Sequence, residues 1–379
     1  MNAELAMVPG TWICTGREVF PSMLAAIEEA RHAICLEIYI YTSGAIGKRF
    51  QEALVRAANR GLLVRVLYDA VGSMTLSSTF WKPLKKAGGE VRQFNPLALF
   101  RLGIRDHRKL LVCDSKVAYV GGFNIADEYH GDGVSSGWRD FGLKLEGALA
   151  EELESSFEEM FTKSDFQHKP FMRLRRSTAK RAIITGNQQL LLSGPGRGRS
   201  PIKLWLMRDL ATAKEVKIVM AYFLPTWRIR RDLARVVRRG GTVDLILPGK
   251  TDVIVSQLAG QSLYRRLLKE GVTIFEYEPQ ILHAKLMIID DIVYVGSANL
   301  DQRSLHINYE LMIRFQNSVF AGQARALFEN MGRHCRRITS EGWSKSRTLW
   351  GRIKQRWAYL LLVRIDPYVA RRQWRGLPD

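Results

Sequence analysis

Alternating apolar and amphipathic stretches define two similar units along the chain. In the first unit, an apolar run at 33–41 (AICLEIYIY) precedes an amphipathic stretch at 47–61 that ends in glycine, and a second apolar run follows at 62–69. This order predicts a strand, a helix and a parallel strand, the βαβ unit. The same three stretches recur in the later half of the chain, at 216–223, 227–241 and 242–248. The hydrophobic pattern therefore predicts a duplicated α/β fold.

An eight-residue pattern appears once in each unit. Residues 107–114 read HRKLLVCD and residues 283–290 read HAKLMIID, so both follow His-x-Lys-x4-Asp. Side chains alternate between the two faces of a strand, which puts each His and its Lys on one face and the Asp on the other. A short polar step and a second apolar run follow each Asp, as in a β-hairpin. Asp114 and Asp290 are therefore predicted to be turn and scaffold residues.

The end of each hairpin adds groups that suit a phosphate. The first hairpin ends in GGFN and the second in GSAN, which supplies Gly122, Asn124, Ser297 and Asn299. Glycine allows close backbone approach, and amide and hydroxyl groups donate hydrogen bonds to an oxyanion. The spacing from His to Asn is 17 positions in the first half and 16 in the second. We expect the turn at Asp290 and Asp291 to be shorter by that one residue.

Two imidazoles and two amines complete the candidate chemistry: His107, Lys109, His283 and Lys285. A neutral imidazole can attack phosphorus, and a protonated one can deliver a proton to the leaving oxygen. The rival interpretations are an ordinary solvated strand pair and a metal site. Duplication of the whole pattern argues against the first. The Lys near each His argues against the second because its charge would repel a divalent cation, so we predict no metal or other cofactor.

The elements divide the chain into four segments. Residues 1–165 and 202–340 are predicted to be tandem α/β domains, each with a mixed, mostly parallel sheet flanked by helices. A basic, turn-rich stretch at 166–201 is predicted to be a linker and loop. Residues 341–379 form a basic tail.

Composition narrows the class of partner. Fifty-seven Lys and Arg against 37 Asp and Glu give a net charge of +20, which favours phosphate-rich partners, either nucleic acid or anionic lipid headgroups. The four cysteines show no metal-type spacing, which favours a reduced, cytoplasmic setting. No signal peptide and no membrane-spanning run is expected.

At this point the residues resemble the phospholipase D superfamily, whose mark is two copies of His-x-Lys-x4-Asp, each followed by Gly-(Gly/Ser)-x-Asn. Within it, HRKLLVCDSKVAYVGGFNIADEY and HAKLMIID with GSANLDQRS resemble the bacterial cardiolipin synthases, of the type lacking N-terminal transmembrane helices. The resemblance implies two domains related by a pseudo-twofold axis with both motifs at one site. It also implies metal-independent catalysis through a phosphohistidine. By similarity His107 would be the nucleophile and His283 the general acid and then base, although the sequence alone is equally compatible with the reverse.

Each histidine also needs a carboxylate to hold its tautomer. Asp140 and Glu310 begin the strand after each hairpin, 33 and 27 residues past the His of the same half. We expect each to orient that His, the alternative being an ordinary surface acid.

The resemblance leaves several functions to compare. A phosphatidyltransferase would convert two phosphatidylglycerols to cardiolipin and glycerol at the cytoplasmic face of the bacterial inner membrane, as a peripheral protein bound to anionic phospholipid. A phospholipase D would release phosphatidic acid, a nuclease of the superfamily would cleave nucleic acid, and a lipid-binding module would do neither. The intact duplicated motifs disfavour the last, and the closer likeness to the synthases disfavours nucleic acid as partner.

The tail carries its own pattern. Trp350, Ile353, Trp357, Leu360 and Leu361 recur at helical spacing, and basic residues flank them, namely Arg352, Lys354, Arg356 and Arg364. Such a helix would lie in the interface of an anionic membrane. The alternative is a terminal helix that packs its apolar face on the body of the protein.

Overall fold

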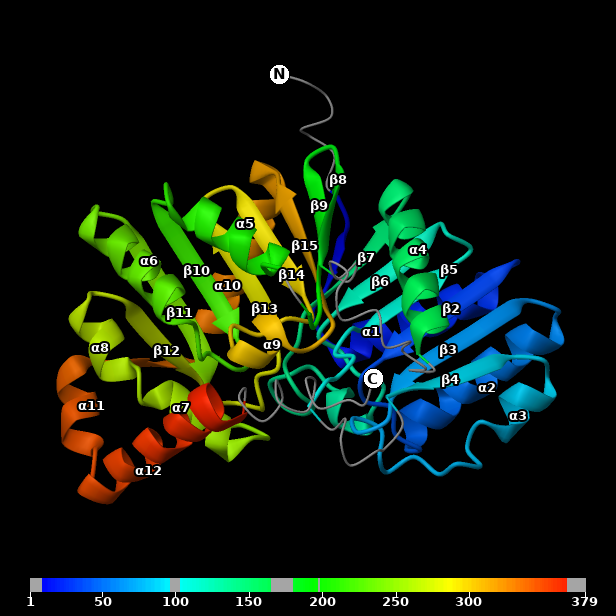
Figure 1. Ribbon diagram of the computed structural model, residues 1–379, viewed down its shortest axis with the longest axis horizontal. Helices are drawn as coiled ribbons and strands as arrows, with labels where there is room; N and C mark the ends of the chain where they lie inside the picture. Colours follow the sequence, from blue (N-terminus) through cyan, green and yellow to red (C-terminus); the bar gives the residue numbers. More distant parts are fainter. Residues whose placement is uncertain (1–8, 96–102, 165–179, 197, 367–379) are drawn as a thin grey trace.

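A computed structural model describes residues 9–95, 103–164, 180–196 and 198–366. Two mixed β-sheets lie side by side, and helices cover both faces of each (Figure 1). The predicted α/β class and the duplication into two mixed-sheet units are confirmed.

The first sheet has the order β1-β7-β6-β5-β2-β3-β4. Its strands are β1 (Thr11–Ile13), β2 (Ala33–Ile38), β3 (Leu63–Asp69), β4 (Glu90–Phe94), β5 (Leu110–Cys113), β6 (Val117–Gly121) and β7 (Gly142–Glu146). One face packs on α1 (Gly16–Glu29), α2 (Ala45–Asn59) and α3 (Lys82–Lys86), and the other on α4 (Ala148–Lys163). The short helix η2 (Asp127–Tyr129) lies in the connection between β6 and β7.

The second sheet has the order β16-β12-β11-β10-β13-β14-β15-β9-β8. Its strands are β8 (Arg181–Thr185), β9 (Gln188–Ser193), β10 (Glu215–Met220), β11 (Thr242–Pro248), β12 (Thr273–Tyr277), β13 (Lys285–Ile289), β14 (Ile292–Gly296), β15 (Glu310–Gln316) and β16 (Cys335–Ile338). Its helices are α5 (Pro201–Leu210), α6 (Trp227–Arg238), α7 (Ile254–Gln261), α8 (Tyr264–Lys269), α9 (Gln302–His306), α10 (Ser318–Gly332), α11 (Ser340–Ser346), α12 (Leu349–Leu360) and η4 (Leu361–Ile365).

The βαβ units explain how the core forms. The apolar strands β2 and β10 are buried on both faces, and α2 and α6 each end at a glycine in the left-handed conformation, Gly61 (φ +88°) and Gly240 (φ +86°). Helices α4 and α10 belong to one hydrophobic cluster that runs through both halves. This shared cluster fixes the two sheets against each other.

The pattern had predicted mostly parallel sheets, and this part of the prediction is wrong. Parallel pairs are confined to β2-β3-β4 and β10-β11-β12. Strands β5 and β13, which carry the motifs, run antiparallel to β2 and β10 because each is the first arm of a hairpin. The βαβ pattern predicted the parallel part and not the strands added beside it.

The predicted linker at 166–201 is wrong in part. Strands β8 and β9 form a hairpin within it, and β9 pairs with β15 at the edge of the second sheet. Leu190, Leu191 and Leu192 are buried there because β9 is covered on both faces. The second domain therefore starts before residue 202. Residues 166–179 and 197 of the stretch lie outside the described residues.

The tail folds back on the second domain. Helix α12 packs on α7 through a face that includes Gln355 and Ala358, which are 6% and 7% exposed, whereas Trp350 and Trp357 remain 72% and 66% exposed. Residues 367–379 lie outside the described part of the chain. Among the described residues, no helix has the length and apolar content that crossing a bilayer requires.

Candidate active site

The two motifs meet between the sheets because the segments next to them cross from one half to the other. Asp106 forms a parallel bridge with Tyr309, and Arg139 forms one with Leu282. The backbone N–H of His107 donates to the carbonyl of Tyr309 at 3.0 Å, and that of His283 donates to the carbonyl of Arg139 at 2.8 Å. Each histidine is thereby placed beside the segment that leads into a strand of the opposite half, β15 for His107 and β7 for His283.

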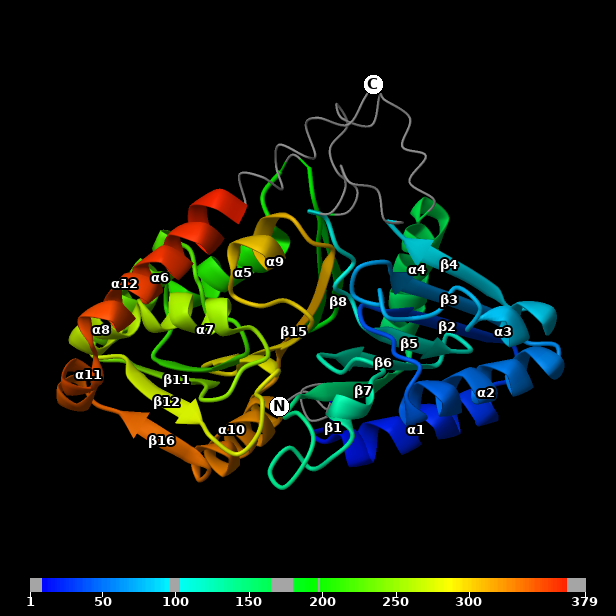
Figure 2. The same ribbon diagram turned by 90° about the horizontal axis from the view of Figure 1, so that it is seen from below.

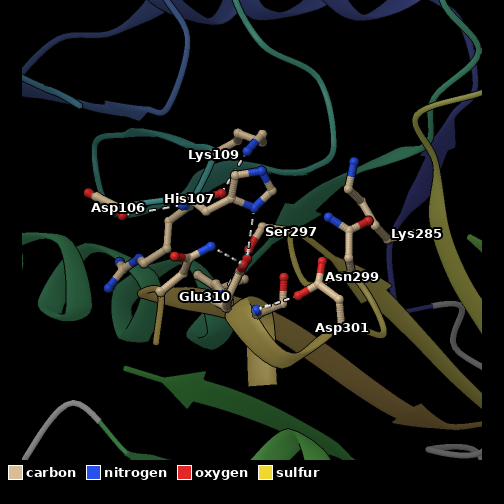
Figure 3. Close-up of polar contacts among 12 residues, drawn as sticks. Asp106, His107, Lys109, Lys285, Ser297, Asn299, Asp301 and Glu310 are labelled. Carbon is tan, nitrogen blue, oxygen red and sulfur yellow. Dashed lines mark hydrogen bonds and ion pairs between the residues drawn. The ribbon is translucent and has the colours of Figure 1, made fainter. Parts of the chain in front are cut away.

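This crossing pairs His107 with Glu310 (Figure 3). The imidazole Nδ1 lies 3.0 Å from the carboxylate Oε2, and the hydroxyl of Ser297 donates to the same oxygen at 2.5 Å. Burial would raise the pKa of Glu310, but His107, Lys109 and Ser297 outweigh burial and hold the pKa below its ordinary value. Burial also lowers the pKa of His107, so a neutral imidazole faces an ionised carboxylate.

The same crossing pairs His283 with Asp140. Nδ1 of the imidazole lies 2.7 Å from Oδ2 of Asp140 and 3.2 Å from the hydroxyl of Tyr129. Burial raises the pKa of Asp140 to about 7, and burial together with the charge of Lys285 holds the pKa of His283 well below its ordinary value. A Cβ on Gly122 would lie 2.1 Å from Oδ1 of Asp140, so the glycine makes room for this carboxylate.

The expected partnership of each carboxylate with the histidine of its own half is therefore wrong. Glu310 contacts the first histidine and Asp140 the second. Both carboxylates are fully buried, so the alternative of surface acids is also wrong. The physical reason is the pseudo-twofold arrangement of the halves. It places the first motif beside the start of β15 and the second motif beside the start of β7.

Both lysines are buried at the site. Nζ of Lys109 donates to the carbonyl of His107 at 2.6 Å, and Nζ of Lys285 donates to the carbonyl of His283 and lies 3.1 Å from Nε2 of the same ring. Burial, and then the charge of Lys285, lowers the pKa of Lys109 to about 7, and burial lowers that of Lys285 to about 8. A bound phosphate would favour the charged form of both amines.

The two asparagines are held by backbone N–H groups just after β2 and β10. Oδ1 of Asn124 accepts from the N–H of Ile40 at 3.1 Å, and Oδ1 of Asn299 accepts from the N–H of Tyr222 at 3.3 Å. The amide of Asn124 donates to the hydroxyl of Tyr129 at 2.7 Å. Asn299 lies beside Lys285 (Figure 3). In this structure the side-chain amide of Asn124 is therefore used to position Tyr129.

The motif aspartates lie in the hairpin turns. Asp114 and Asp290 have positive φ, 55° and 49°, and their carboxylates accept from the N–H groups of residues 31–33 and 214–215. This geometry agrees with the predicted scaffold role. The turn between β5 and β6 spans 114–116 and that between β13 and β14 spans 290–291, which confirms the expected one-residue difference.

Several aromatic neighbours were not predicted from the sequence. The ring centroid of Tyr39 lies 4.8 Å from that of His107, and Tyr222 lies 6.3 Å from His283. Tyr39 and Tyr222 occupy equivalent positions at the ends of the duplicated strands, and this repetition could have predicted them. Tyr129 and Trp138, 5.4 Å and 5.7 Å from the His283 ring, lie in an unduplicated connection and gave none.

Comparison with known proteins agrees with the family resemblance of the two motifs. Residues 23–161 and 206–332 match the family described as cardiolipin synthase, PLD-like domain. Cardiolipin synthase 1 of Bacillus anthracis is 34% identical over 346 residues, which cover 88% of this chain and 68% of that protein. The major cardiolipin synthase of Bacillus subtilis is 33% identical over 356 residues, which cover 92% of this chain and 74% of that protein.

A solved structure shares the fold at lower identity. Phosphatidylserine synthase of Haemophilus influenzae superposes with a TM-score of 0.74 at 14% identity, covering 98% of this chain and 96% of that one. The family match takes in both His-x-Lys-x4-Asp motifs and the strands that carry them. The chain therefore belongs to the phospholipase D superfamily, among the cardiolipin synthase PLD-like domains, and is a cardiolipin synthase-like enzyme of that superfamily.

Proposed function

We propose that this protein is a metal-independent phosphatidyltransferase that converts two phosphatidylglycerols to cardiolipin and glycerol. The observation that carries the proposal is the meeting of two buried imidazoles, each hydrogen-bonded to a buried carboxylate, with two buried lysines. This set can bind a phosphodiester, attack it and move a proton without a further group. The names of the relatives supply the substrate class.

The proposed reaction has two displacements. Nε2 of His107 attacks the phosphorus of one phosphatidylglycerol, a P–N bond forms, and the P–O bond to the departing glycerol breaks as that oxygen takes a proton from His283. The hydroxyl of the second phosphatidylglycerol then gives its proton to His283, and its oxygen attacks phosphorus while the P–N bond breaks. Both imidazoles return to their starting states.

The surroundings of the two rings support this order. Glu310 has a lowered pKa, so its carboxylate is ionised and can stabilise the positive charge that develops on His107 as the P–N bond forms. Asp140 has a pKa of about 7, so it can accept or release a proton together with His283 near neutrality. A bound phosphate would offset the charge of Lys285 and raise the pKa of His283 toward that of a general acid.

We further propose that the enzyme works as a peripheral protein at the cytoplasmic face of the bacterial inner membrane. The net charge of +20 supports attraction to an anionic surface. Phosphatidylglycerol is itself an anionic phospholipid, so the same surface would supply the substrate.

The test is turnover of phosphatidylglycerol in detergent micelles with EDTA present, followed by mass spectrometry of the lipids. The proposal requires cardiolipin and glycerol in equal amounts. Phosphatidic acid as the sole product would replace it with a phospholipase, and cleavage of DNA alone would replace it with a nuclease. His283→Ala is the inactive reference, and His334→Ala, at an exposed histidine, is the matched control that keeps full turnover.

A further inference from the structure

Helix α12 turns its apolar face away from the body of the protein. Trp350, Ile353, Trp357, Leu360 and Leu361 are 72%, 38%, 66%, 41% and 42% exposed. The contacts with the body come instead from the face that carries Gln355 and Ala358. The two Trp rings of this stripe are thus largely free of the body of the protein, whereas Ile353, Leu360 and Leu361 are partly covered, so packing does not account for the two rings.

Helical geometry explains the arrangement. At about 100° per residue, the exposed apolar side chains fall on one side of the cylinder, and Gln355 and Ala358 fall on the other. Arg352 and Arg356 lie at one border of the stripe and Lys354 at the other border, and all three are exposed. An apolar stripe with cations along both borders is the pattern of a helix that lies in a membrane interface.

A neighbouring helix also exposes apolar side chains at its start. Helix α7 lies along α12 (Figure 2), and its N-terminal end carries Val253, Ile254 and Val255, which are 40%, 68% and 38% exposed. Arg230 of α6 donates to the hydroxyl of Tyr359, so one further basic side chain contacts α12. We call the exposed side chains at 350, 353, 357 and 360 of α12, at 361 of η4 and at 253–255 at the start of α7 the α12 surface.

We propose that the α12 surface docks on an anionic lipid bilayer, with the Trp, Ile and Leu side chains inserted at the headgroup level and the basic residues on lipid phosphates. This inference rests on the proposed function and adds the surface that brings the enzyme to its lipid. A second copy of the chain fits less well, because a twofold contact between these surfaces would place Arg352 and Arg356 against the same cations of the partner.

The position of α12 supports the same occupant. After η4, Asp366 forms a two-pronged ion pair with Arg303 of α9, at 2.6 Å and 2.8 Å. Helix α9 starts at the N-cap Asp301, two residues after Asn299 of the site. The C-terminal end of the proposed docking helix is therefore tied to the segment that carries a candidate phosphate ligand.

The experiment compares two double variants of the full chain. Trp350→Ser with Trp357→Ser removes the two most exposed aromatic rings of the α12 surface. The matched control, Ile184→Ser with Val319→Ser, removes exposed apolar side chains on β8 and α10 (63% and 47% exposed). Flotation is measured with phosphatidylglycerol–phosphatidylcholine vesicles and with pure phosphatidylcholine vesicles, over a range of salt concentrations.

We expect the Trp variant to bind the anionic vesicles about tenfold more weakly or worse, with an unchanged melting temperature and unchanged turnover of micellar phosphatidylglycerol. Wild type and control should bind alike, more weakly to phosphatidylcholine, and more weakly as salt rises. The inference would be overturned if the Trp variant floated with the vesicles as well as wild type does. It would also be overturned if wild type formed a dimer and the Trp variant lost this dimer while its flotation stayed unchanged. Trp-dependent flotation without phospholipid turnover in micelles would instead refute the proposed function alone.

Discussion

The two halves of the site share a motif but surround their histidines differently. Glu310 accepts from a serine hydroxyl as well as from its histidine, and its pKa is lowered. Asp140 lacks that hydroxyl, because Gly122 stands where the other half has Ser297, and burial raises its pKa to about 7. Residues outside the duplicated His-x-Lys-x4-Asp pattern thus give two equal imidazoles unequal electrostatic environments.

The largest expected effect comes from removing each imidazole in turn. His107→Ala and His283→Ala should each lower turnover of phosphatidylglycerol by about 10⁴-fold, because one ring forms the bond to phosphorus and the other moves the proton. The comparison becomes sharper with a nitrophenyl phosphodiester, whose leaving group needs no proton. His283→Ala should then regain about 10²-fold and accumulate phosphorus label on His107. Rescue of His107→Ala instead, with label on His283, would reverse the two roles.

The carboxylates should differ in their pH dependence. Glu310 has a lowered pKa and is ionised throughout pH 6–8, so Glu310→Gln should lose about 10²-fold or more at both ends of that range. Asp140 titrates at about 7 and is largely protonated at pH 6, which Asn imitates. The deficit of Asp140→Asn should therefore grow roughly tenfold from pH 6 to pH 8. Initial rates of both variants against wild type across the range measure this, and a flat Asp140→Asn deficit would contradict the assigned difference.

Exchanging the residues beneath the carboxylates tests the same asymmetry with a smaller effect. Gly122→Ser places a Cβ 2.1 Å from an oxygen of Asp140, so the carboxylate must move and activity should fall about 10²-fold. Ser297→Gly removes one hydrogen bond to Glu310 and should cost about tenfold. Melting temperatures measured beside the rates separate misplacement from unfolding. A Ser297→Gly deficit larger than that of Gly122→Ser would show that packing beneath Asp140 is not what distinguishes the halves.

The smallest effect on activity should come from the turn aspartates, where the halves agree. Asp114→Asn and Asp290→Asn weaken hydrogen bonds to backbone N–H groups and should lower the free energy of unfolding by about 1–2 kcal/mol each, with turnover per folded molecule nearly unchanged.

A pH series adds a check at the first turn. Partial burial raises the pKa of Asp114, but the N–H groups at 31–33 outweigh it and keep the pKa low. Its stabilising contribution is therefore present above the unfolded pKa of about 3.9 and disappears as pH falls through the lower folded value. Urea unfolding at pH 7 and pH 3 tests both statements, and wild-type stability with lost turnover would assign these aspartates to catalysis.

Local pattern was enough to predict the repeated strand-helix-strand units and the shorter second turn, because periodicity and turn length are properties of neighbouring residues. It failed where partners come from far along the chain. The contact of His107 with Glu310 joins residues 203 positions apart, and nothing in either segment says which half it faces. Strand β9 was not predicted, because its neighbours along the chain are basic and its pairing partner β15 lies far along the chain. Tyr129 contacts His283 only because of the same long-range crossing.

The bridges between the halves, Asp106–Tyr309 and Arg139–Leu282, also limit how the duplicated gene can change during evolution. Because each histidine borrows its carboxylate from the other half, neither half encodes a complete working set by itself. Two separately expressed halves would restore the site only by assembling with each other, and a lesion in one carboxylate would appear in genetic tests as a defect of the opposite motif. A duplicated gene of this kind can let its two copies diverge in charge and packing, but it cannot let either copy decay.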